Sequence, residues 1–585
     1  MTVELAIASL RQQHIVSGNH QESRYFDAIK ALVAGRNAAE GTAERQKWQQ
    51  AIDQIYQLVE DEILHNTAPP TKAISFGTSG WRGTLGKDLS VHTVAVVTAA
   101  ILGMYQNAQD SEELRTALGV ADFKEVQARG CVIGFDNRFG GSLLARAAVN
   151  VLQANGVQIY YAGEATTGAL SASVLIHKAA FSINLTPSHN PLEYGGFKYN
   201  AADAGPAAPI LTDTITNLAR QYIQLDQIPM IPAELDLLQP VEASSKIIME
   251  DALESWQQLI RAGSTQHGIE YDRLLKELAA NDQVVVCIDA VHGASRLYLQ
   301  RLLNNPPDER LILLRKTADP TFGGIAPEPS SANMQPALAA LVARPEPLKI
   351  GAVIDPDGDR IRFTDGTIEI SMNQFGAMAY HFLHEVKGKR GMVAKTVASS
   401  NLANGIAAQL GEKVFEPRVG FKEFKPVINK ALVYFEESDG ISIIGHTPEK
   451  DAFIGLILAI DMILTLKKPL GSYLAAIEEQ FGHYYPDRDA VVVSLQGDSL
   501  LQALNQLSRY SPCSKVTVGE QSRTIASVID IDGRKMIFED GSWIMIRPSG
   551  TEPKVRFYVE GRTSDETALL VKTAKSMLAE IGLLP

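Results

Sequence analysis

The chain has 585 residues, which is enough for three to five globular domains. Its formal net charge of −13 argues against a general binder of nucleic acids or anionic membranes, because such partners favour a basic surface. The charge does not exclude a small anionic ligand, which needs only a few local arginines. A hydrophobic content of 45% with 21% charged residues is ordinary for a globular protein.

The sequence shows no pattern typical of targeting or membrane insertion. The N-terminus lacks the basic start and apolar core of a signal peptide. The longest apolar stretches, Val94–Met104 and Phe453–Leu466, are too short to span a bilayer, so we interpret both as buried helices. The widely spaced Cys131, Cys287 and Cys513 indicate buried free thiols in a reducing compartment. We therefore expect a cytoplasmic protein.

Residues 1–70 differ in composition from the rest of the chain. They are rich in Gln, Ala and Glu, carry apolar residues at helical spacing, and end at Ala68-Pro69-Pro70. This pattern predicts two or three helices packed on the body of the protein. With no visible chemistry, the segment is interpreted as an accessory or contact element.

From residue 71, short β-rich runs alternate with amphipathic helices, which argues for βαβ units and mixed or parallel sheets. The β-rich runs are Gly130–Phe135, Val284–Ile288, Ile350–Ile354 and Gly391–Thr396. The helices that follow the first, second and fourth of these runs are Ser142–Ala154, Ala294–Leu303 and Leu402–Leu410. The C-terminal part instead has closely spaced strand-like runs before a closing helix: Ala490–Ser494, Thr524–Ile531, Lys535–Glu539 and Trp543–Arg547. It predicts a separate α+β domain joined near Tyr485-Pro486.

The first candidate functional segment is Thr186-Pro187-Ser188-His189-Asn190-Pro191, directly after the strand-like run Ala180–Leu185. Its prolines predict a tight, exposed turn, and functional loops of α/β sheets lie beyond the strand ends. Ser188 is a candidate nucleophile that needs a base or a charge field for activation. Thr-Pro-Ser also occurs in ordinary loops, and His189 alone is more often a turn residue than a base.

A second segment, Asp355-Pro356-Asp357-Gly358-Asp359-Arg360, places three carboxylates at alternate positions on one turn. Such carboxylates can converge on one hard cation, and ligands that are all oxygen favour Mg²⁺ over zinc. An EF-hand loop also begins with alternating aspartates. It requires glycine where Arg360 stands and a bidentate glutamate where Gly366 stands, so this alternative fails. A solvated acidic turn is the plain alternative.

Two further segments complete the series. Glu436-Glu437-Ser438-Asp439-Gly440 could grip several hydroxyl groups, although alone it is a weak signal. Arg547-Pro548-Ser549-Gly550-Thr551, with Arg556 just beyond, offers arginines, hydroxyls and glycine-exposed amides that suit a phosphate. Together the four segments offer a nucleophile, a metal-binding loop, a turn that could bind hydroxyl groups and a loop that could bind a phosphate. These parts indicate phosphoryl transfer on a sugar phosphate.

The four segments, together with Phe76–Gly83, Gly195–Asn200 and Val419–Lys422, resemble the α-D-phosphohexomutase superfamily, closest to the phosphoglucomutases. The resemblance covers residues 71–585. It implies four domains around one cleft, three α/β domains with mixed sheets and a smaller C-terminal α+β domain. The expected divisions are a helical extension 1–70, then 71–240, 241–368, 369–485 and 486–585.

The resemblance also implies a role for each matching residue. Ser188 would be the phosphoserine that gives and receives the phosphoryl group. Mg²⁺ would be bound by Asp355, Asp357 and Asp359 with an oxygen of phosphorylated Ser188. The catalytic set would be Ser188, Arg82, Lys198, His189 and Lys450. The residues that would bind substrate are Arg360, Gly420, Phe421, Glu436, Ser438, Arg547, Ser549, Gly550, Thr551 and Arg556.

The activity implied by the resemblance is interconversion of glucose 1-phosphate and glucose 6-phosphate, with glucose 1,6-bisphosphate as intermediate and activator. A phosphomannomutase or dual-specificity hexomutase, and a glucose 1,6-bisphosphate synthase, would keep the same motifs. A non-catalytic sugar-phosphate binder would have no use for an intact nucleophile and metal loop. We expect a small hexose phosphate as ligand, no nucleic-acid or membrane partner, and a monomer or homodimer.

Two positions depart from the family pattern, Asp439 and Ala452. The Asp439 carboxylate could face the sugar hydroxyls or point to solvent, and the sequence leaves both open. As a third carboxylate beside Glu436 and Glu437, it is expected to raise a neighbouring pKa. These departures bear on the choice of sugar more than on the reaction type.

Overall fold

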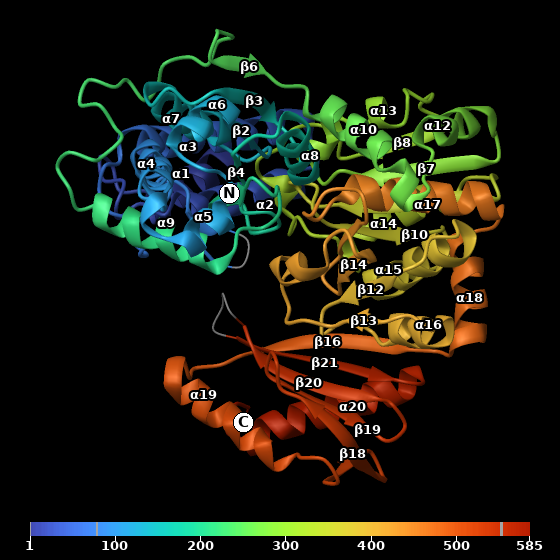
Figure 1. Cartoon of the computed structure of the whole chain (residues 1–585). Coiled ribbons are helices and arrows are strands. Elements are labelled where there is room, and N and C mark those ends of the chain that lie inside the picture. The colour runs from blue at the N-terminus through green and yellow to red at the C-terminus, as the bar shows by residue number, and fades with distance from the viewer. Residues whose placement is uncertain (1, 78–79, 550–553, 585) are drawn as a thin grey trace.

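The computed structural model describes residues 2–77, 80–549 and 554–584. Its strands form four sheets that follow one another along the chain (Figure 1). The first three sheets mix parallel and antiparallel strands, whereas the fourth is antiparallel throughout. This confirms the predicted four-domain architecture of three α/β units and a C-terminal α+β unit.

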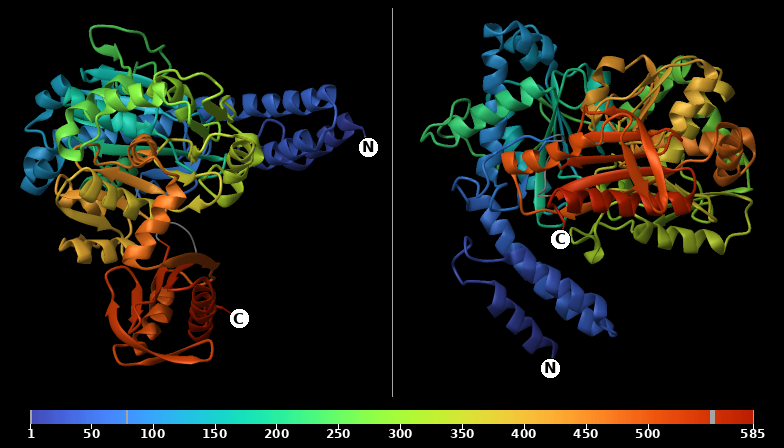
Figure 2. Two further views of the ribbon diagram at one scale, coloured as in Figure 1. Left: turned by 90° about the vertical axis from the view of Figure 1, so that its right-hand side faces the viewer. Right: turned by 90° about the horizontal axis from the view of Figure 1, so that it is seen from below.

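The N-terminal segment forms the predicted helices, namely α1 (Val3–His14), α2 (Tyr25–Ala38) and α3 (Thr42–His65). α2 and α3 pack against each other, and apolar residues from both join the core beneath the first sheet. Figure 2 shows α1 and the adjoining parts of α2 and α3 projecting from the body. One part of the segment therefore belongs to the core of the first domain, and the other part projects from the body of the protein.

The first sheet has the strand order β1-β5-β4-β2-β3-β6. Its strands are β1 (Trp81–Thr84), β2 (Cys131–Phe135), β3 (Ile159–Glu164), β4 (Phe181–Leu185), β5 (Tyr194–Ala201) and β6 (Ile247–Met249). Its main helices are α4 (Val91–Gln106), α7 (Gly141–Ala154), α8 (Thr167–His177) and α9 (Pro209–Tyr222). β6 pairs with β3 although it lies after residue 240, where the sequence suggested a boundary.

The second sheet has the order β11-β10-β9-β7-β8 and the third the order β13-β12-β14-β15. The second comprises β7 (Val284–Asp289), β8 (Leu311–Leu314), β9 (Leu348–Ile354), β10 (Ile361–Thr364) and β11 (Glu369–Ile370). The third comprises β12 (Met392–Lys395), β13 (Val414–Phe415), β14 (Ala431–Glu436) and β15 (Gly440–Ile443). Among their helices are α10 (Ala252–Ala262), α12 (Tyr271–Ala280), α14 (Ser331–Val342), α15 (Met372–His381), α16 (Leu402–Leu410), α17 (Ala452–Leu466) and α18 (Leu470–Phe481).

The fourth sheet has the order β16-β21-β20-β19-β18-β17. It comprises β16 (Tyr485–Val492), β17 (Lys515–Val518), β18 (Gln521–Ile529), β19 (Arg534–Phe538), β20 (Trp543–Pro548) and β21 (Lys554–Gly561). Helices α19 (Gly497–Asn505) and α20 (Ser564–Glu580) accompany it. Pro486 is accepted in β16 because β16 is an edge strand, where a missing amide donor costs little.

The two apolar runs predicted to be buried helices are α4 and α17, and both are buried along nearly their whole length. Within the described residues, no helix combines the length and apolar character needed to cross a bilayer. Cys131 and Cys287 are buried free thiols as expected. Cys513 is exposed, so that prediction was wrong for it. It lies in the turn before β17 rather than in a sheet interior.

The predicted helix Ala294–Leu303 is instead a 3₁₀ turn, Ala294–Leu297, followed by the short helix α13 (Leu299–Leu302). Arg296 forms an ion pair with Glu164, and the Tyr298 hydroxyl donates to the Glu164 carbonyl at 3.0 Å. These contacts join the break in the helix to the end of β3 in the first sheet.

All four candidate segments occupy the same kind of position. Each connects two antiparallel neighbours, one pair in each sheet: β4 and β5, β9 and β10, β14 and β15, and β20 and β21. A short turn between antiparallel strands holds its side chains at the edge of a sheet. Each of the first three sheets therefore presents one chemically distinctive turn, and the fourth segment begins in β20 and continues outside the described residues.

Candidate active site

The serine turn is tight, and Ser188 adopts the left-handed conformation with φ of +58°. Its amide donates to Thr186 Oγ1 at 2.9 Å, and Thr186 Oγ1 donates to Asp136 Oδ2 at 2.6 Å. The prediction of an exposed turn was wrong for its serine, since Ser188 is only 1% accessible, whereas Pro191 in the same turn is exposed. Ser188 is buried because the loop carrying Asp355 lies against it.

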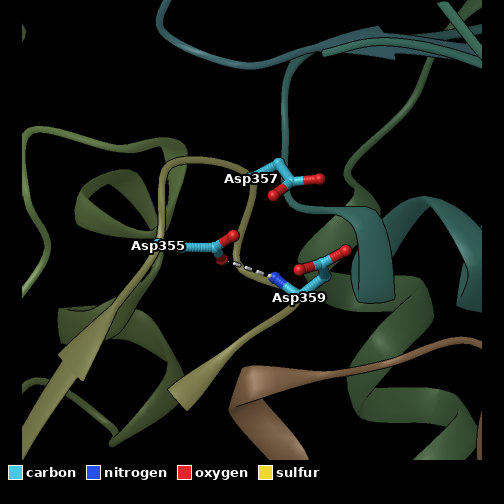
Figure 3. A group of neighbouring side chains, drawn as sticks. All are labelled: Asp355, Asp357 and Asp359. Carbon is cyan, nitrogen blue, oxygen red and sulfur yellow. Dashed lines mark hydrogen bonds between the residues drawn. The ribbon is translucent and has the colours of Figure 1, made fainter. Parts of the chain in front are cut away.

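The serine turn and the aspartate loop are in direct contact, although they belong to different sheets. Ser188 Oγ donates to Asp355 Oδ2 at 2.9 Å and lies 3.5 Å from Asp359 Oδ1. Asp355 Oδ1 accepts the amides of Asp359 and Arg360, both at 3.0 Å, so the loop folds back onto its first carboxylate (Figure 3). The predicted nucleophile thus lies beside the predicted metal ligands.

The aspartate loop suits a hard divalent cation. Oxygens of Asp355, Asp357 and Asp359 lie within 4.8 Å of one another, and all three residues are buried. Within the described part of the chain, Asp357 Oδ1 is buried without a hydrogen-bond partner. Burial and the neighbouring carboxylates raise the pKa of Asp355 well above its ordinary value. A cation here would satisfy the free oxygen and relieve the repulsion between the carboxylates.

Basic side chains surround the aspartate loop. Lys198 Nζ lies 2.6 Å from Asp357 Oδ2 and 3.0 Å from Asp359 Oδ2. Burial alone would raise the pKa of Asp359, but Lys198, Lys450 and Arg360 hold it well below its ordinary value. The loop is therefore largely charge-balanced by protein groups from several elements.

Arg82 and His189 lie near the same charges. His189 Nδ1 is 3.4 Å from Ser188 Oγ. Burial, and then the positive charges of Arg360 and Arg82, lower the pKa of His189 well below its ordinary value. Burial and Arg360 also lower the pKa of Arg82, which β1 places opposite Gly196 of β5. The predicted catalytic residues Ser188, Arg82, Lys198 and His189 thus share one region.

Lys450 connects the aspartate loop with the turn between β14 and β15. Its Nζ lies 3.2 Å from Asp359 Oδ2 and 3.9 Å from Glu436 Oε2. Burial raises the pKa of Glu436, although Lys450 partly opposes this effect. Ser438, two residues further on, is partly exposed. The side chains predicted to grip the sugar therefore lie next to the metal loop.

Asp439 neither faces solvent nor has a free carboxylate. It is 3% exposed, and Arg362 of β10 holds both of its oxygens, with Nε–Oδ1 at 3.0 Å and Nη2–Oδ2 at 2.7 Å. Its carbonyl accepts the Ile361 amide at 2.9 Å. Burial raises the pKa of Glu436, and the Glu437 carboxylate adds to this effect, whereas Asp439 raises the pKa of Arg362, its ion-pair partner, against the opposing effect of burial. Asp439 therefore joins the predicted hydroxyl-binding turn to β10, the strand that follows the aspartate loop.

The fourth segment is only partly described, and the predicted ligands Gly550 and Thr551 lie outside the described residues. Arg547 and Arg556 are directly paired positions of β20 and β21, so their side chains emerge on the same face. Arg547 Nε lies 3.0 Å from Asp532 Oδ2. Ser549 N donates to the Lys554 carbonyl at 2.8 Å, which closes the base of this turn.

Gly420 directly precedes the 3₁₀ helix Phe421–Val427, and Phe421 begins that helix. Gly420 has φ of +131°, and the Phe421 ring packs against Phe424 and Tyr434 in a small core. The Phe421 ring is only 4% exposed, so a substrate contact at this position would come from the main chain.

Sequence reasoning missed several residues that position the site. Thr167 Oγ1 donates to Asp357 Oδ2 at 2.8 Å, and the Thr167 amide donates to the Asp357 carbonyl. Asp451 accepts the ring N–H of Trp256, binds His446 Nε2 and caps α17 directly after Lys450. These residues lie outside the segments that the sequence singled out, although Asp451 directly follows the predicted catalytic residue Lys450.

The chain matches four domain models described as phosphoglucomutase/phosphomannomutase. The alpha/beta/alpha domains I, II and III match residues 73–226, 267–368 and 371–481, and the C-terminal domain matches 510–574. A phosphoglucomutase from Komagataeibacter xylinus is 26% identical over 528 residues, covering 84% of this chain and 88% of that protein. A phosphomannomutase from Mycoplasma pneumoniae is 24% identical over 519 residues, covering 83% and 87%.

Solved structures share the fold. A putative phosphomannomutase from Thermus thermophilus has a TM-score of 0.66 at 24% identity, covering 87% of this chain and 99% of that one. The open form of pp63/parafusin, a phosphoglucomutase from Paramecium, has a TM-score of 0.67 at 19% identity, covering 88% and 96%. With all four domain models matched in order, the chain belongs to the phosphoglucomutase/phosphomannomutase family.

Proposed function

We propose that this protein is a phosphoglucomutase, an intramolecular phosphotransferase that interconverts glucose 1-phosphate and glucose 6-phosphate. The observation that carries the proposal is the 2.9 Å contact between Ser188 Oγ and Asp355, inside a buried cluster of three aspartates and Lys198. Curated relatives across most of the chain are named phosphoglucomutase.

The reaction proceeds through Ser188 in its phosphorylated form. A hydroxyl oxygen of the sugar phosphate attacks the phosphorus and loses its proton, while the bond between phosphorus and Ser188 Oγ breaks and Ser188 Oγ takes up a proton. The resulting glucose 1,6-bisphosphate turns end for end, and its other phosphoryl group returns to Ser188. Phosphoryl transfer depends chiefly on positioning and charge neutralisation, which Lys198, Arg82 and Lys450 supply.

Asp355, Asp357 and Asp359, with an oxygen of the phosphoserine, would hold Mg²⁺, since hard oxygen ligands favour this ion. When bound, the ion would neutralise charge on the transferring phosphoryl group. The aspartates themselves keep Lys198 in place through its contacts with Asp357 and Asp359.

A mutase also needs a second site for the phosphate that is not reacting. Arg547 and Arg556 share one face of the β20–β21 hairpin, and Ser549 adjoins it. Paired arginines suit phosphate because they donate several charge-assisted hydrogen bonds. Glu436 and Ser438 would hold sugar hydroxyls between the two sites.

Two related activities use the same residues. A phosphomannomutase or dual-specificity enzyme is favoured by the similarity to the Mycoplasma pneumoniae phosphomannomutase. A glucose 1,6-bisphosphate synthase would differ in the phosphoryl donor and in which product leaves. Relatives whose names include "cytoplasmic" favour the cytoplasm as the location, and a monomer or homodimer stays a prediction.

A coupled assay of the purified protein with Mg²⁺ and bisphosphate activator tests the proposal. Glucose 1-phosphate, mannose 1-phosphate and glucosamine 1-phosphate are supplied separately, and the released product is identified. We expect glucose 6-phosphate from glucose 1-phosphate with the highest kcat/KM. Turnover of mannose 1-phosphate alone, or release of glucose 1,6-bisphosphate as the final product, would replace this assignment by the corresponding alternative.

A further inference from the structure

The N-terminal helices α2 and α3 precede residue 73, where the first family model begins, yet they contact elements of two different domains. From α2, Asn37 Nδ2 donates to the Gly323 carbonyl at 2.8 Å. Arg36, also on α2, lies 3.4 Å from Thr321 Oγ1 and 3.6 Å from Asp319 Oδ2. The α2 helix therefore holds a loop that belongs to the second sheet's domain.

That loop has an unfavourable backbone. Phe322, Gly323 and Gly324 have consecutive positive φ values of +52°, +65° and +85°. A bulky residue such as phenylalanine rarely adopts this conformation, so surrounding contacts must maintain it. A Cβ added at Gly324 would come within 2.8 Å of Val33 Cγ1 on α2, which shows how closely helix and loop pack.

The conformation places the Phe322 ring over the Arg138 guanidinium, 4.8 Å from Cζ to the ring centroid. Phe322 is 1% exposed and Arg138 6% exposed, so the pair is shielded from water. Helix α3, which forms a helical hairpin with α2, contacts Phe139, the residue that follows Arg138. Its Tyr56 stacks on Phe139, with ring centroids 4.4 Å apart.

Arg138 in turn holds the main chain of the serine turn. Its Nη2 donates to the Ser188 carbonyl at 2.7 Å and to the Asn190 carbonyl, and its Nη1 donates to the Pro191 carbonyl at 2.7 Å. Nη1 also lies 3.3 Å from the Tyr194 carbonyl. One guanidinium thus fixes four carbonyls around the proposed nucleophile.

We propose that the α2–α3 hairpin sets the position of Ser188 through Phe322 and Arg138, which act as positioning residues. The proposal rests on the proposed function, because it requires Ser188 to be the phosphoryl carrier. The Phe322 ring covers the guanidinium and excludes water that would otherwise compete for the turn carbonyls. An oriented guanidinium then keeps Ser188 Oγ aligned, and a displacement of about 1 Å can lower a rate about 100-fold.

The experiment compares Phe322→Leu, Asn37→Ala and the double variant in the full chain. Phe322→Leu keeps an apolar side chain but removes the ring over Arg138, and Asn37→Ala removes the bond from α2. Phe322→Tyr keeps the ring and serves as the conservative variant. Lys47→Ala is the matched control, because Lys47 pairs with Glu4 at the surface of the same segment.

We expect Phe322→Leu to lower kcat by roughly tenfold or more with KM changed less than about twofold, because alignment rather than substrate affinity is lost. Phe322→Tyr should retain most of the activity, and Lys47→Ala all of it. Asn37→Ala should lower kcat less, and the double variant should lose less than the product of the two single effects, since both act through one loop. The rate at which labelled glucose 1,6-bisphosphate phosphorylates Ser188 should fall in parallel with kcat.

A lower Tm with unchanged kcat and unchanged phosphorylation rate in Phe322→Leu and Asn37→Ala would overturn the proposal and leave the hairpin a stabilising element. Ser188→Ala, assayed alongside, keeps the two hypotheses apart. Activity in Ser188→Ala would refute the proposed function itself. An inactive Ser188→Ala with fully active Phe322→Leu and Asn37→Ala would refute only the positioning role.

Discussion

The serine turn with its aspartate loop and the arginine hairpin of the fourth sheet are both charged, but they are assembled differently. Ser188 reaches Asp355 across 167 residues and a domain boundary. Arg547 and Arg556 instead face each other through the register of two adjacent strands. The first assembly depends on how separate domains pack, whereas the second depends on one hairpin.

The two regions also differ in charge balance. The carboxylates beside Ser188 are matched by Lys198, Lys450 and Arg360 from the protein itself. At the hairpin, two arginines occupy facing positions, an arrangement that like charges disfavour, and Asp532 pairs with Arg547 at 3.0 Å. An anion bound close to both would lower that repulsion. The first region is therefore a buried cluster of opposite charges, whereas the second brings two positive side chains together on one face of a hairpin.

The largest effect is expected from Ser188→Ala, which removes the proposed phosphoryl carrier while leaving the turn's main chain in place. Turnover should fall nearly to background, and the far-UV circular dichroism should match the wild type. Intact-mass analysis should find one phosphate on the wild type and none on the variant. Full activity in the variant would refute a mechanism in which Ser188 carries the phosphoryl group.

The next effect concerns the metal loop. Asp357→Asn keeps the side-chain shape but removes a charge that binds Lys198 at 2.6 Å and a candidate metal ligand. We expect kcat to fall at least about tenfold and the Mg²⁺ concentration for half-maximal activity to rise, since a carboxylate ligand is lost. EDTA should abolish wild-type activity and added Mg²⁺ should restore it.

Asp61→Asn supplies the control, because Asp61 is exposed and lies on α3 away from the loop. It should behave as wild type in both assays. Undiminished turnover of the wild type after thorough chelation would contradict the metal assignment.

Arg547→Ala tests the other side of the comparison. Because the idle phosphate is bound in both ground and transition states, losing this contact should raise KM for glucose 1-phosphate more than it lowers kcat. Steady-state kinetics measure the two effects. Arg509→Ala, which removes a surface ion pair with Glu580 in the same domain, should leave KM unchanged. A fall confined to kcat would place Arg547 at the transferring phosphate instead.

The sequence predicted the four turns because each is a contiguous motif with unusual residue types. It also predicted α4, α16 and α17 closely, since long apolar or amphipathic runs have few alternative structures. Residues that act across domains left no such signal. Thr167 binds Asp357 from 190 positions away, and the partners of Arg138 are main-chain carbonyls, which no sequence motif reveals.

Asp439 shows the same limit at a single position. Its place beside Ser438 suggested either a sugar contact or a solvated turn, and both depended on local neighbours. The structure instead pairs it with Arg362, 77 residues earlier in the chain. Long-range pairing of this kind depends on how the second and third sheets pack, which local sequence patterns do not encode.

The smallest effect is expected from Asp439, and it distinguishes positioning from sugar selection. Asp439→Asn keeps the shape but removes the charge that holds Arg362, so the turn carrying Glu436 and Ser438 should be held less firmly against β10. We expect kcat/KM to fall several-fold, equally for glucose 1-phosphate and mannose 1-phosphate, with Ser188 phosphorylation unchanged. Charge-assisted hydrogen bonds of this kind contribute about 1.5–3 kcal/mol each at most, and Asn retains part of that.

Asp439→Gly provides the matched comparison, because glycine accepts the φ of +72° without strain but cannot bind Arg362. If the ion pair is what matters, this variant should be impaired at least as much as Asp439→Asn despite its more favourable backbone. If strain relief dominates, Asp439→Gly should be more active than Asp439→Asn. A several-fold change in the glucose-to-mannose ratio of kcat/KM for either variant would contradict the positioning role, because a carboxylate whose two oxygens are held by Arg362 acts on the position of the turn and not on one hydroxyl of the sugar.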